Sequence, residues 1–274
     1  MQAIKQIRSL CTLSLVLLGV MLVAGPVQSS DKDPAAAALE DDTAARALLS
    51  QMADTLSKST AFSVNVRSHH DSIQPDGQSI EFSERRKIML WRPAHLRVEV
   101  ERSDGDLSLL LFDGKTITAY KADDKIYAQV EKPGTIDATI IYLVKTLQAP
   151  FPLARMFLTT LSRDIQQWIE SVRFVEEDTL TEPPSIHLAG QSVDVDFQIW
   201  VTQDENPVPL RIVLTYRNDP GQPQFRADFT DWTLAPDTDA ASFTFVPPVD
   251  VEQILFLAPV QNNSLPVGQE GGKP

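Results

Sequence analysis

Residues 109–130, LLLFDGKTITAYKADDKIYAQV, decide the fold class, because they have the pattern of three short strands joined by two tight turns. Asp113-Gly114 is the strongest short-range signal for a two-residue type I′ hairpin, which needs positive φ at both positions. Residues 122–124, Ala-Asp-Asp, predict the second turn, since aspartate side chains bond their own backbone. The strands are rich in Leu, Ile, Thr and Tyr, which suit a half-buried sheet. Such a meander buries one face and needs a second layer over it.

Alternation of apolar and polar residues continues on both sides of this meander. Val193, Val195, Phe197, Ile199 and Val201, for example, fall on one face of a single strand. Apolar residues at helical spacing predict one helix before the strands and helical segments between two groups of strands. The predicted strands are 62–66, 78–91, 96–100, the three within 109–130, 172–176, 185–188, 193–202, 207–216, 222–232 and 243–246, and the predicted helical segments are 43–57, 135–148, 153–161 and 164–170.

About eleven short strands with regular alternation predict a mainly β protein with some α structure. We expect one curved antiparallel sheet, or incomplete β-barrel, whose concave face is covered by the helices. No internal repeat or linker divides the chain. The folded domain is therefore expected over residues 43–250, after a flexible leader at 31–42 and before a flexible tail at 251–274.

Residues 1–30 have the pattern of a secretory signal peptide. Lys5 and Arg8 precede an uncharged apolar run at 10–24, and small residues follow a Gly-Pro break. The run is short for a membrane span, and an uncleaved anchor is the alternative. Cys11, the single cysteine, lies inside it, whereas a lipoprotein signal has its cysteine after the apolar run. We expect an exported mature chain without disulfides that is held together by core burial.

The charge balance of the chain restricts its partners. The formal net charge is −13, and removal of Lys5 and Arg8 with the signal peptide makes it −15. A strongly acidic surface keeps a protein soluble and repels nucleic acid and anionic membrane surfaces. We therefore expect no nucleic-acid partner.

No set of residues has the spacing of a catalytic or metal site. Asp194 and Asp196 fall on the polar face of a predicted strand, where acids are usually solvated, and no histidine has ligand spacing to them. His69 and His70 are adjacent, so a strand points them to opposite faces, which disfavours one shared zinc ion. The sequence contains no nucleophile elbow, ordered Ser/His/Asp set or phosphate-binding glycine loop. We expect a protein that is not an enzyme and uses neither metal nor cofactor.

Several short motifs punctuate the predicted strands and turns: Trp91-Arg92-Pro93, Phe112-Asp113-Gly114-Lys115, Pro133-Gly134-Thr135-Ile136-Asp137, Pro223-Gln224-Phe225, Asp231-Trp232 and Phe243-Thr244-Phe245. With these motifs the chain resembles an uncharacterised family of predicted periplasmic proteins, over about residues 45 to 250. That family in turn resembles the lipoprotein-carrier superfamily of bacterial periplasms, the LolA/LolB-like fold, whose incomplete barrel is plugged by helices on its concave side. The resemblance implies a periplasmic protein that carries acyl chains, although no stretch matches the carriers' contacts with a transporter or receptor.

A wide curved sheet encloses more volume than a few helices fill, which predicts an apolar cavity under the helices. We expect a monomer that binds a lipid, an acyl chain or an acylated lipoprotein there, with an envelope protein as a second candidate partner. The alternative is a non-enzymatic structural or adaptor protein of the envelope with the same fold and a filled core. The predicted cavity-lining residues are Leu96, Val98, Ile117, Phe197, Ile199, Leu210, Ile212, Phe225 and Phe229 on the sheet, and Ile140, Val144, Leu147, Phe151 and Phe157 on the cover.

Overall fold

The computed structural model describes residues 34–147 and 153–256, with side chains from residue 42 onward. Twelve strands form one sheet, and neighbours are antiparallel except β12, which runs parallel to β6. The strands are β1 (Ala61–Ile73), β2 (Ser79–Trp91), β3 (His95–Arg102), β4 (Leu107–Phe112), β5 (Thr116–Lys121), β6 (Ile126–Glu131), β7 (Ile169–Asp178), β8 (Ser185–Ser192), β9 (Val195–Thr202), β10 (Pro209–Tyr216), β11 (Gln224–Thr233) and β12 (Glu252–Ile254). The helices are α1 (Pro34–Lys58), α2 (Ile136–Lys145) and α3 (Leu161–Trp168), with the 3-10 helices η1 (Ala154–Phe157) and η2 (Ala240–Phe243).

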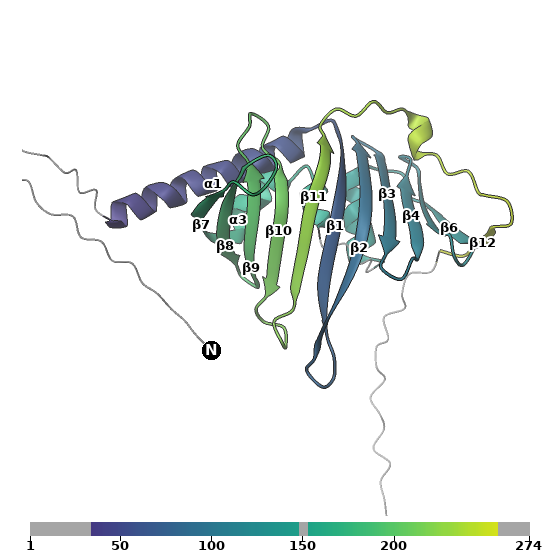
Figure 1. The fold of residues 1–274 in the computed structure, drawn as a ribbon. Helices are drawn as coiled ribbons and strands as arrows, with labels where there is room; N and C mark the ends of the chain where they lie inside the picture. The colour runs from purple at the N-terminus through teal and green to yellow at the C-terminus, as the bar shows by residue number, and fades with distance from the viewer. Residues whose placement is uncertain (1–33, 148–152, 257–274) are drawn as a thin grey trace, which may run out of the picture.

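The order of the strands shows how the two strand groups join. Across the sheet it is β12-β6-β5-β4-β3-β2-β1-β11-β10-β9-β8-β7. The long β1–β2 hairpin lies in the middle, and the chain builds outward from it to β6 (Figure 1). The chain next reaches the far edge at β7 and returns strand by strand until β11 pairs with β1. The helices between β6 and β7 therefore have to pass over one face of the sheet.

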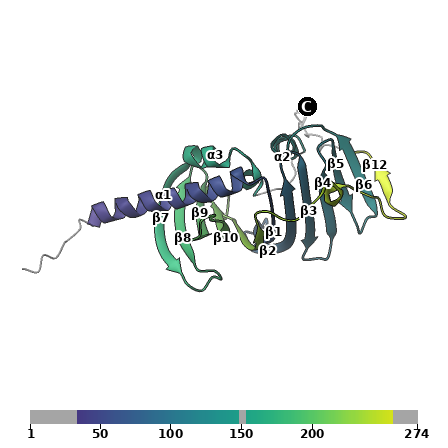
Figure 2. The same cartoon turned by 90° about the horizontal axis from the view of Figure 1, so that it is seen from above.

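The sheet curves around its helices and stays open. Seen from above, α1 and α3 lie against the half of the sheet that holds β7–β10, and α2 lies against the half that holds β2–β6 (Figure 2). The predicted fold class is confirmed: a mainly β protein whose curved antiparallel sheet has helices over its concave face. The sheet has twelve strands where about eleven were expected.

Helix α1 begins earlier than predicted. The sequence predicts a helix over 43–57, but α1 starts at Pro34, so residues 34–42 of the expected flexible leader are helical. Proline is favoured in the first helical turn because it lacks an N–H, and the alanines at 35–38 have the highest helix propensity. These residues were missed because they carry no apolar stripe. The buried stripe of α1 begins further along, at Ala45, Leu49, Met52, Ala53 and Leu56.

The turn between β4 and β5 is a hairpin, but not of the predicted type. β4 ends at Phe112 and β5 begins at Thr116, so the loop is residues 113–115. Only Gly114 has positive φ, at +93°, which glycine adopts without steric cost. The Asp113 carboxylate accepts hydrogen bonds from the backbone N–H of Lys115 (2.9 Å) and Thr116 (2.7 Å). An aspartate turn therefore replaces the expected type I′ pair.

Two predictions at the C-terminal end are wrong. Residues 243–246 are not a strand, because Phe243 ends η2 and the following residues lie outside the sheet. Phe243 is buried against Trp91 and His95 on the face of the sheet opposite the helices. Glu252–Ile254, which fall in the expected flexible tail, form β12 along the edge of β6. A three-residue strand has too little alternation to be recognised in a sequence.

The main hydrophobic core lies between the concave face and the helices. Phe62 of β1 is fully buried, and its ring lies 5.9 Å from that of Phe157 and 5.6 Å from that of Trp232. Phe112 and Ile117 extend the core toward α2. Bulky side chains therefore fill the middle of the sheet. Within the described residues, no helix has both the length and the apolarity to cross a bilayer.

Candidate functional site

A cavity of about 890 Å³ lies under the roof that η1, α3 and part of α1 form over β9 and β10. We call it the α3 cavity. Its polar lining residues are Arg155, Ser192, Asp194, Asn218 and Asp219. The apolar and aromatic side chains that line it are Leu49, Met52, Leu153, Met156, Leu161, Ile165, Trp168, Ile169, Val193, Val195, Phe197, Ile199, Ile212, Leu214 and Tyr216. The space is therefore mostly apolar, with a few polar groups, as is typical of small-molecule sites.

Strand register builds the floor of the α3 cavity. Ile212 lies opposite Ile199, and Leu214 lies opposite Phe197, in the antiparallel pairing of β10 with β9. Side chains that oppose each other across two strands point to the same face, so these four form one apolar patch. The alternation seen in the sequence therefore does place them together on the concave side.

A glycine sets the position of the Phe197 ring. Gly190 of β8 is the cross-strand partner of Phe197. A Cβ atom at Gly190 would lie 2.4 Å from Cζ of Phe197 and 2.5 Å from the carbonyl oxygen of Ser171, closer than real Cβ contacts. The ring thus occupies the space that a side chain at position 190 would need. This fixes one wall of the cavity.

The residues predicted to line a cavity fall into three groups. Phe197, Ile199 and Ile212 line the α3 cavity. Eight others are buried in the core without lining it: Leu96, Val98, Ile117, Ile140, Leu147, Phe157, Phe225 and Phe229. These eight belong to the main hydrophobic core, where aromatic rings pack beside two of them: Phe62 beside Phe157, and Trp232 beside Phe229.

Two of the remaining three predicted residues do not line the α3 cavity. Val144 is exposed on α2, contrary to the prediction that it covers the sheet. Leu210 is half-buried at the point where the register of β10 with β9 shifts, and such an irregularity interrupts the alternation on which the prediction rested. Phe151 lies outside the described residues.

The prediction missed most of the roof. Trp168 and Ile165 of α3 line the cavity, as do Met156 and Arg155 from η1. α3 has only eight residues, so its apolar stripe is too short to separate from irregular structure in the sequence. Leu214 was also missed as a site residue, although it continues the alternation of Ile212.

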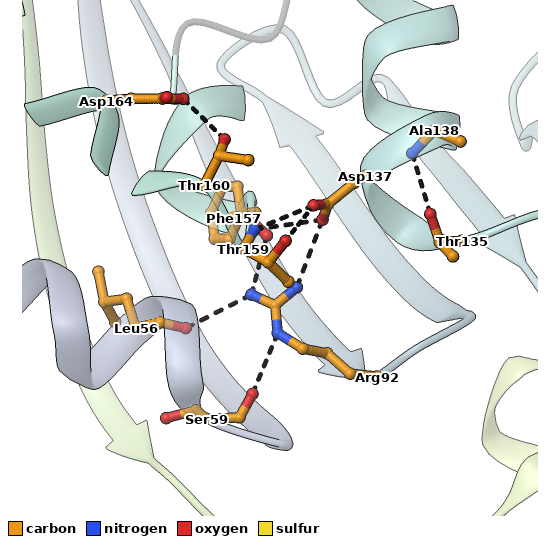
Figure 3. A network of polar contacts seen from close by, with 10 residues as sticks. All are labelled: Leu56, Ser59, Arg92, Thr135, Asp137, Ala138, Phe157, Thr159, Thr160 and Asp164. Carbon is orange, nitrogen blue, oxygen red and sulfur yellow. Dashed lines mark hydrogen bonds and ion pairs between the residues drawn. The ribbon is translucent and has the colours of Figure 1, made fainter. Parts of the chain in front are cut away.

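Arg92, at the end of β2, joins the roof to the rest of the molecule (Figure 3). Its guanidinium donates hydrogen bonds to the carbonyl oxygens of Ser59 (3.0 Å), Leu56 (3.4 Å) and Phe157 (2.9 Å). It also forms an ion pair with Asp137, with 3.6 Å between Nη1 and Oδ1. Burial lowers the pKa of Arg92, and the Asp137 carboxylate opposes that shift. One buried cation therefore contacts the end of α1, the start of α2 and the end of η1.

Asp137 extends this network to the segment that leads into α3. Its carboxylate accepts hydrogen bonds from both the backbone N–H and the hydroxyl of Thr159. Asp137 lies in the first turn of α2, where the helix dipole favours negative charge, and Thr135 caps that helix by accepting from the N–H of Ala138 (3.3 Å). The roof of the α3 cavity is thus held on one side by a set of charge-assisted hydrogen bonds (Figure 3).

Comparison with known protein families identifies the family of this chain. Residues 45–257 match the family model described as "Predicted periplasmic protein (DUF2092)". The chain belongs to the DUF2092 family. The resemblance expected from the turn and strand motifs is thereby confirmed, and the family's description agrees with the periplasmic location predicted from residues 1–30. Residues 1–30 themselves lie outside the described structure.

Solved structures similar to this DUF2092 chain are distant in sequence. An uncharacterised conserved protein from Thermus thermophilus is 12% identical with a TM-score of 0.45, and the match covers 77% of this chain and 99% of that one. The LolA superfamily protein NE2245 from Nitrosomonas europaea is 13% identical with a TM-score of 0.37, and the match covers 73% of this chain and 97% of that one. A chain in the structure of the MucA/MucB complex from Pseudomonas aeruginosa is 15% identical with a TM-score of 0.39, and the match covers 74% of this chain and 61% of that one. No curated protein sequence matches the chain.

A second cavity of about 760 Å³ in the DUF2092 domain has more polar residues in its lining than the α3 cavity. It lies near the end of the β1–β2 hairpin and is lined in part by Arg86 and Glu84, whose side chains form a buried ion pair of 2.5 Å. Tyr216 and Asp219 line both this cavity and the α3 cavity. Burial, and then the charge of Asp219, raise the pKa of the Tyr216 phenol, so it stays neutral at ordinary pH. The two cavities therefore share a neutral tyrosine and an aspartate in their linings.

The acids and histidines singled out in the sequence have structural partners in the DUF2092 domain. Asp194 accepts from the side-chain amide of Asn218 (2.9 Å), and Asp196 forms an ion pair with Arg217 (3.2 Å). His70 stacks on Phe82. Within the described part of the chain, no three His, Cys, Asp or Glu side chains are grouped so that they could hold a metal ion.

Proposed function

We propose that this protein is a non-enzymatic periplasmic binder or carrier, and that its α3 cavity holds the hydrocarbon chain of an amphiphile. The observation that carries the proposal is the cavity itself: about 890 Å³, with apolar side chains from α1, α3, β9 and β10 on several sides. This volume lies within the range of roughly 300–1,000 Å³ that is typical of ligand pockets. The periplasmic location in the family description supplies the setting in which such amphiphiles occur.

The driving force would be burial of the chain. Each methylene removed from water contributes about 0.8 kcal/mol, so a dozen contribute about 10 kcal/mol before the costs of association. Immobilising the ligand offsets several kcal/mol of that. With a cost of about 4 kcal/mol, the binding free energy is about −6 kcal/mol, a dissociation constant of tens of micromolar, which suits reversible holding.

The lining supports binding rather than catalysis. Besides the phenol of Tyr216, its polar members are an arginine, a serine, an asparagine and two aspartates. Hydrolysis by a nucleophile needs a base within hydrogen-bond reach of it. The serine of the lining, Ser192, donates its hydroxyl to the carbonyl oxygen of Val195 (3.3 Å). We therefore propose a protein that holds its ligand unchanged.

The alternative is an envelope adaptor with the same fold. The observation in its favour is the filled centre of the sheet, where the buried Phe62 ring packs against the rings of Phe157 and Trp232. In that case the α3 cavity would be a packing defect without affinity for lipids.

Fluorescence titration separates the two functions. The mature protein is titrated with N-phenyl-1-naphthylamine, a neutral dye that brightens in apolar sites, and dodecanoate is then added. If the cavity binds amphiphiles, the fluorescence of the dye should rise to saturation with a stoichiometry of one site, and dodecanoate should reverse the rise. A protein with native circular dichroism that neither brightens the dye nor takes up dodecanoate would contradict the proposal and leave the adaptor.

A further inference from the structure

Arg155 is a cation at the α3 cavity with an unusual environment. It lies in η1, is exposed and belongs to the cavity lining. Its guanidinium carbon lies 3.8 Å from the centroid of the Trp168 ring, so the flat group is stacked on the indole. Trp168 is the last residue of α3 and lines the same cavity. The arginine is therefore held at the site by an aromatic face.

The stacking leaves the hydrogen-bonding edge of Arg155 open. Within the described residues, its guanidinium forms no ion pair with a carboxylate, whereas the neighbouring Arg163 pairs with Asp164 (3.1 Å). A guanidinium has five N–H donors in a planar fork, and stacking uses its face rather than this edge. The fork fits a carboxylate or a phosphate with two parallel hydrogen bonds.

The other charged groups of the lining are Asp194 and Asp219. Asp194 already accepts from Asn218, and both aspartates are exposed to solvent, which screens their charge. They favour a cationic head group, while Arg155 favours an anionic one. Arg155 differs from them in being stacked on Trp168. A guanidinium that is held in place in this way loses less rotamer freedom when it binds an anion.

We infer that Arg155 selects the head group of the ligand, and that the α3 cavity takes single-chain amphiphiles with a carboxylate or phosphate head. This inference rests on the proposed function, since the apolar cavity holds the chain while Arg155 binds the anion. The edge of the guanidinium donates to the anionic oxygens, and Trp168 keeps its plane in place. Removing the charge should weaken binding of anionic amphiphiles and spare neutral ones.

The experiment compares four probes with the same chain: dodecanoate, dodecyl phosphate, dodecanol and dodecyltrimethylammonium. Each displaces N-phenyl-1-naphthylamine from wild type, Arg155→Gln and Arg173→Gln. Arg173 is a matched control, because it is an exposed arginine of β7 that does not line the cavity. We expect wild type to prefer the two anionic probes over dodecanol. In Arg155→Gln, their affinity should fall about tenfold while that of dodecanol changes less than about twofold.

Arg155→Lys supplies a second variant, which keeps the charge but not the planar fork. It should retain part of the preference for anions. Acetate and inorganic phosphate are added alone to test whether the site is one for free anions.

The outcomes separate the inference from the proposed function. Equal affinity for all four heads, preference for the cationic probe, or an equal loss in Arg173→Gln would overturn the role of Arg155 and leave the cavity as a chain-binding site. Displacement of the dye by inorganic phosphate or acetate at the concentrations that work for the amphiphiles would overturn the inference that the site takes amphiphiles, because the chain would then contribute nothing and the site would be one for free anions. Failure of every probe, dodecanol included, would instead refute the proposed function.

Discussion

The Arg92 guanidinium donates a hydrogen bond to the carbonyl oxygen of Phe157, 2.9 Å away, although 65 residues separate the two along the chain. This contact joins the end of β2 to the roof of the α3 cavity. The Arg92 side chain is only 11% exposed, and its other partners are Asp137 and two carbonyl groups at the end of α1. A buried cation in this position makes the roof part of the folded structure rather than a loose cover.

Replacement of Arg92 by alanine should therefore destabilise the protein. The change removes the ion-pair partner of Asp137 and one donor from each of three carbonyl groups in a partly buried site, which costs about 2–4 kcal/mol in the free energy of unfolding. Arg85→Ala, on the strand β2 that ends just before Arg92 in the chain, is the matched control, because the Arg85–Glu101 pair is exposed and its loss should cost less than about 1 kcal/mol. Urea unfolding measures both, and equal losses would show that the Arg92 network has no special role.

Gly190→Ala tests how the wall of the α3 cavity is built. An added Cβ would collide with the Phe197 ring and with the backbone of Ser171, and relief of the second contact requires a shift of β7. Overpacking of this kind costs about 1–3 kcal/mol. Gly134→Ala is the control, since a Cβ there would meet only the Cβ of Ala138 at 3.7 Å. Thermal unfolding should show a clear loss for Gly190→Ala and little for Gly134→Ala, and the reverse order would contradict the described packing.

Leu214→Trp should block the α3 cavity by filling it. Leu214 is half-buried on its floor, so a larger side chain has open space to enter. The affinity for dodecanoate should fall at least about tenfold, while the free energy of unfolding changes by less than about 1.5 kcal/mol. Thr215→Trp, one residue further along β10 and on its other face, should leave the affinity unchanged. Equal affinity in wild type and Leu214→Trp would show that the ligand binds elsewhere.

Acid should weaken the contact between α1 and the roof. Hydrogen bonds from Ser162 and Lys58 hold the pKa of Asp54 below its ordinary value of 3.8. The pKa of Asp71 is also lowered: burial alone would raise it, but hydrogen bonds from Arg226 and the N–H of Gln224 outweigh burial. A carboxyl with a lowered folded-state pKa contributes stability that is present above its unfolded pKa and is lost as pH falls through the folded one. We expect the free energy of unfolding to fall below about pH 4.

The variants Asp54→Asn and Asp71→Asn test whether protonation of these two carboxylates causes the loss of stability in acid. Each variant should be less stable than wild type at pH 7, and the difference should shrink as the pH falls from about 4 to 2, because wild type then loses the same charge. A difference that stays constant over this range would show that the two carboxylates do not titrate with stability.

The fold was predictable because alternation and turn residues are local signals. The run at 193–201 alternates cleanly, and Phe197 and Ile199 do lie on the concave face. Asp113 and Gly114 do make a hairpin turn, although the aspartate side chain rather than a type I′ geometry closes it. These features depend on neighbours in sequence, so one chain is enough to predict them.

The position of the cavity was not predictable, because it depends on how volumes fill. Leu96 and Phe229 have the same alternation as Ile199, yet they are packed into the core. Which part of a concave face stays open depends on the sizes of side chains far apart in the chain, such as Phe62 and Phe157. Periodicity shows the face on which a residue lies but not what lies above it. The roof was missed for a different reason: α3 is too short to show a clear apolar stripe, and no sequence pattern surrounds Arg155.

Native mass spectrometry of the mature protein, purified from the periplasm without detergent, tests the central claim most directly. If the α3 cavity binds amphiphiles, part of the protein will carry the added mass of one single-chain lipid, and added dodecanoate will replace it one for one. Leu214→Trp, purified in the same way, will carry none. A wild-type mass equal to that of the polypeptide alone, which remains so after incubation with dodecanoate, would contradict the claim.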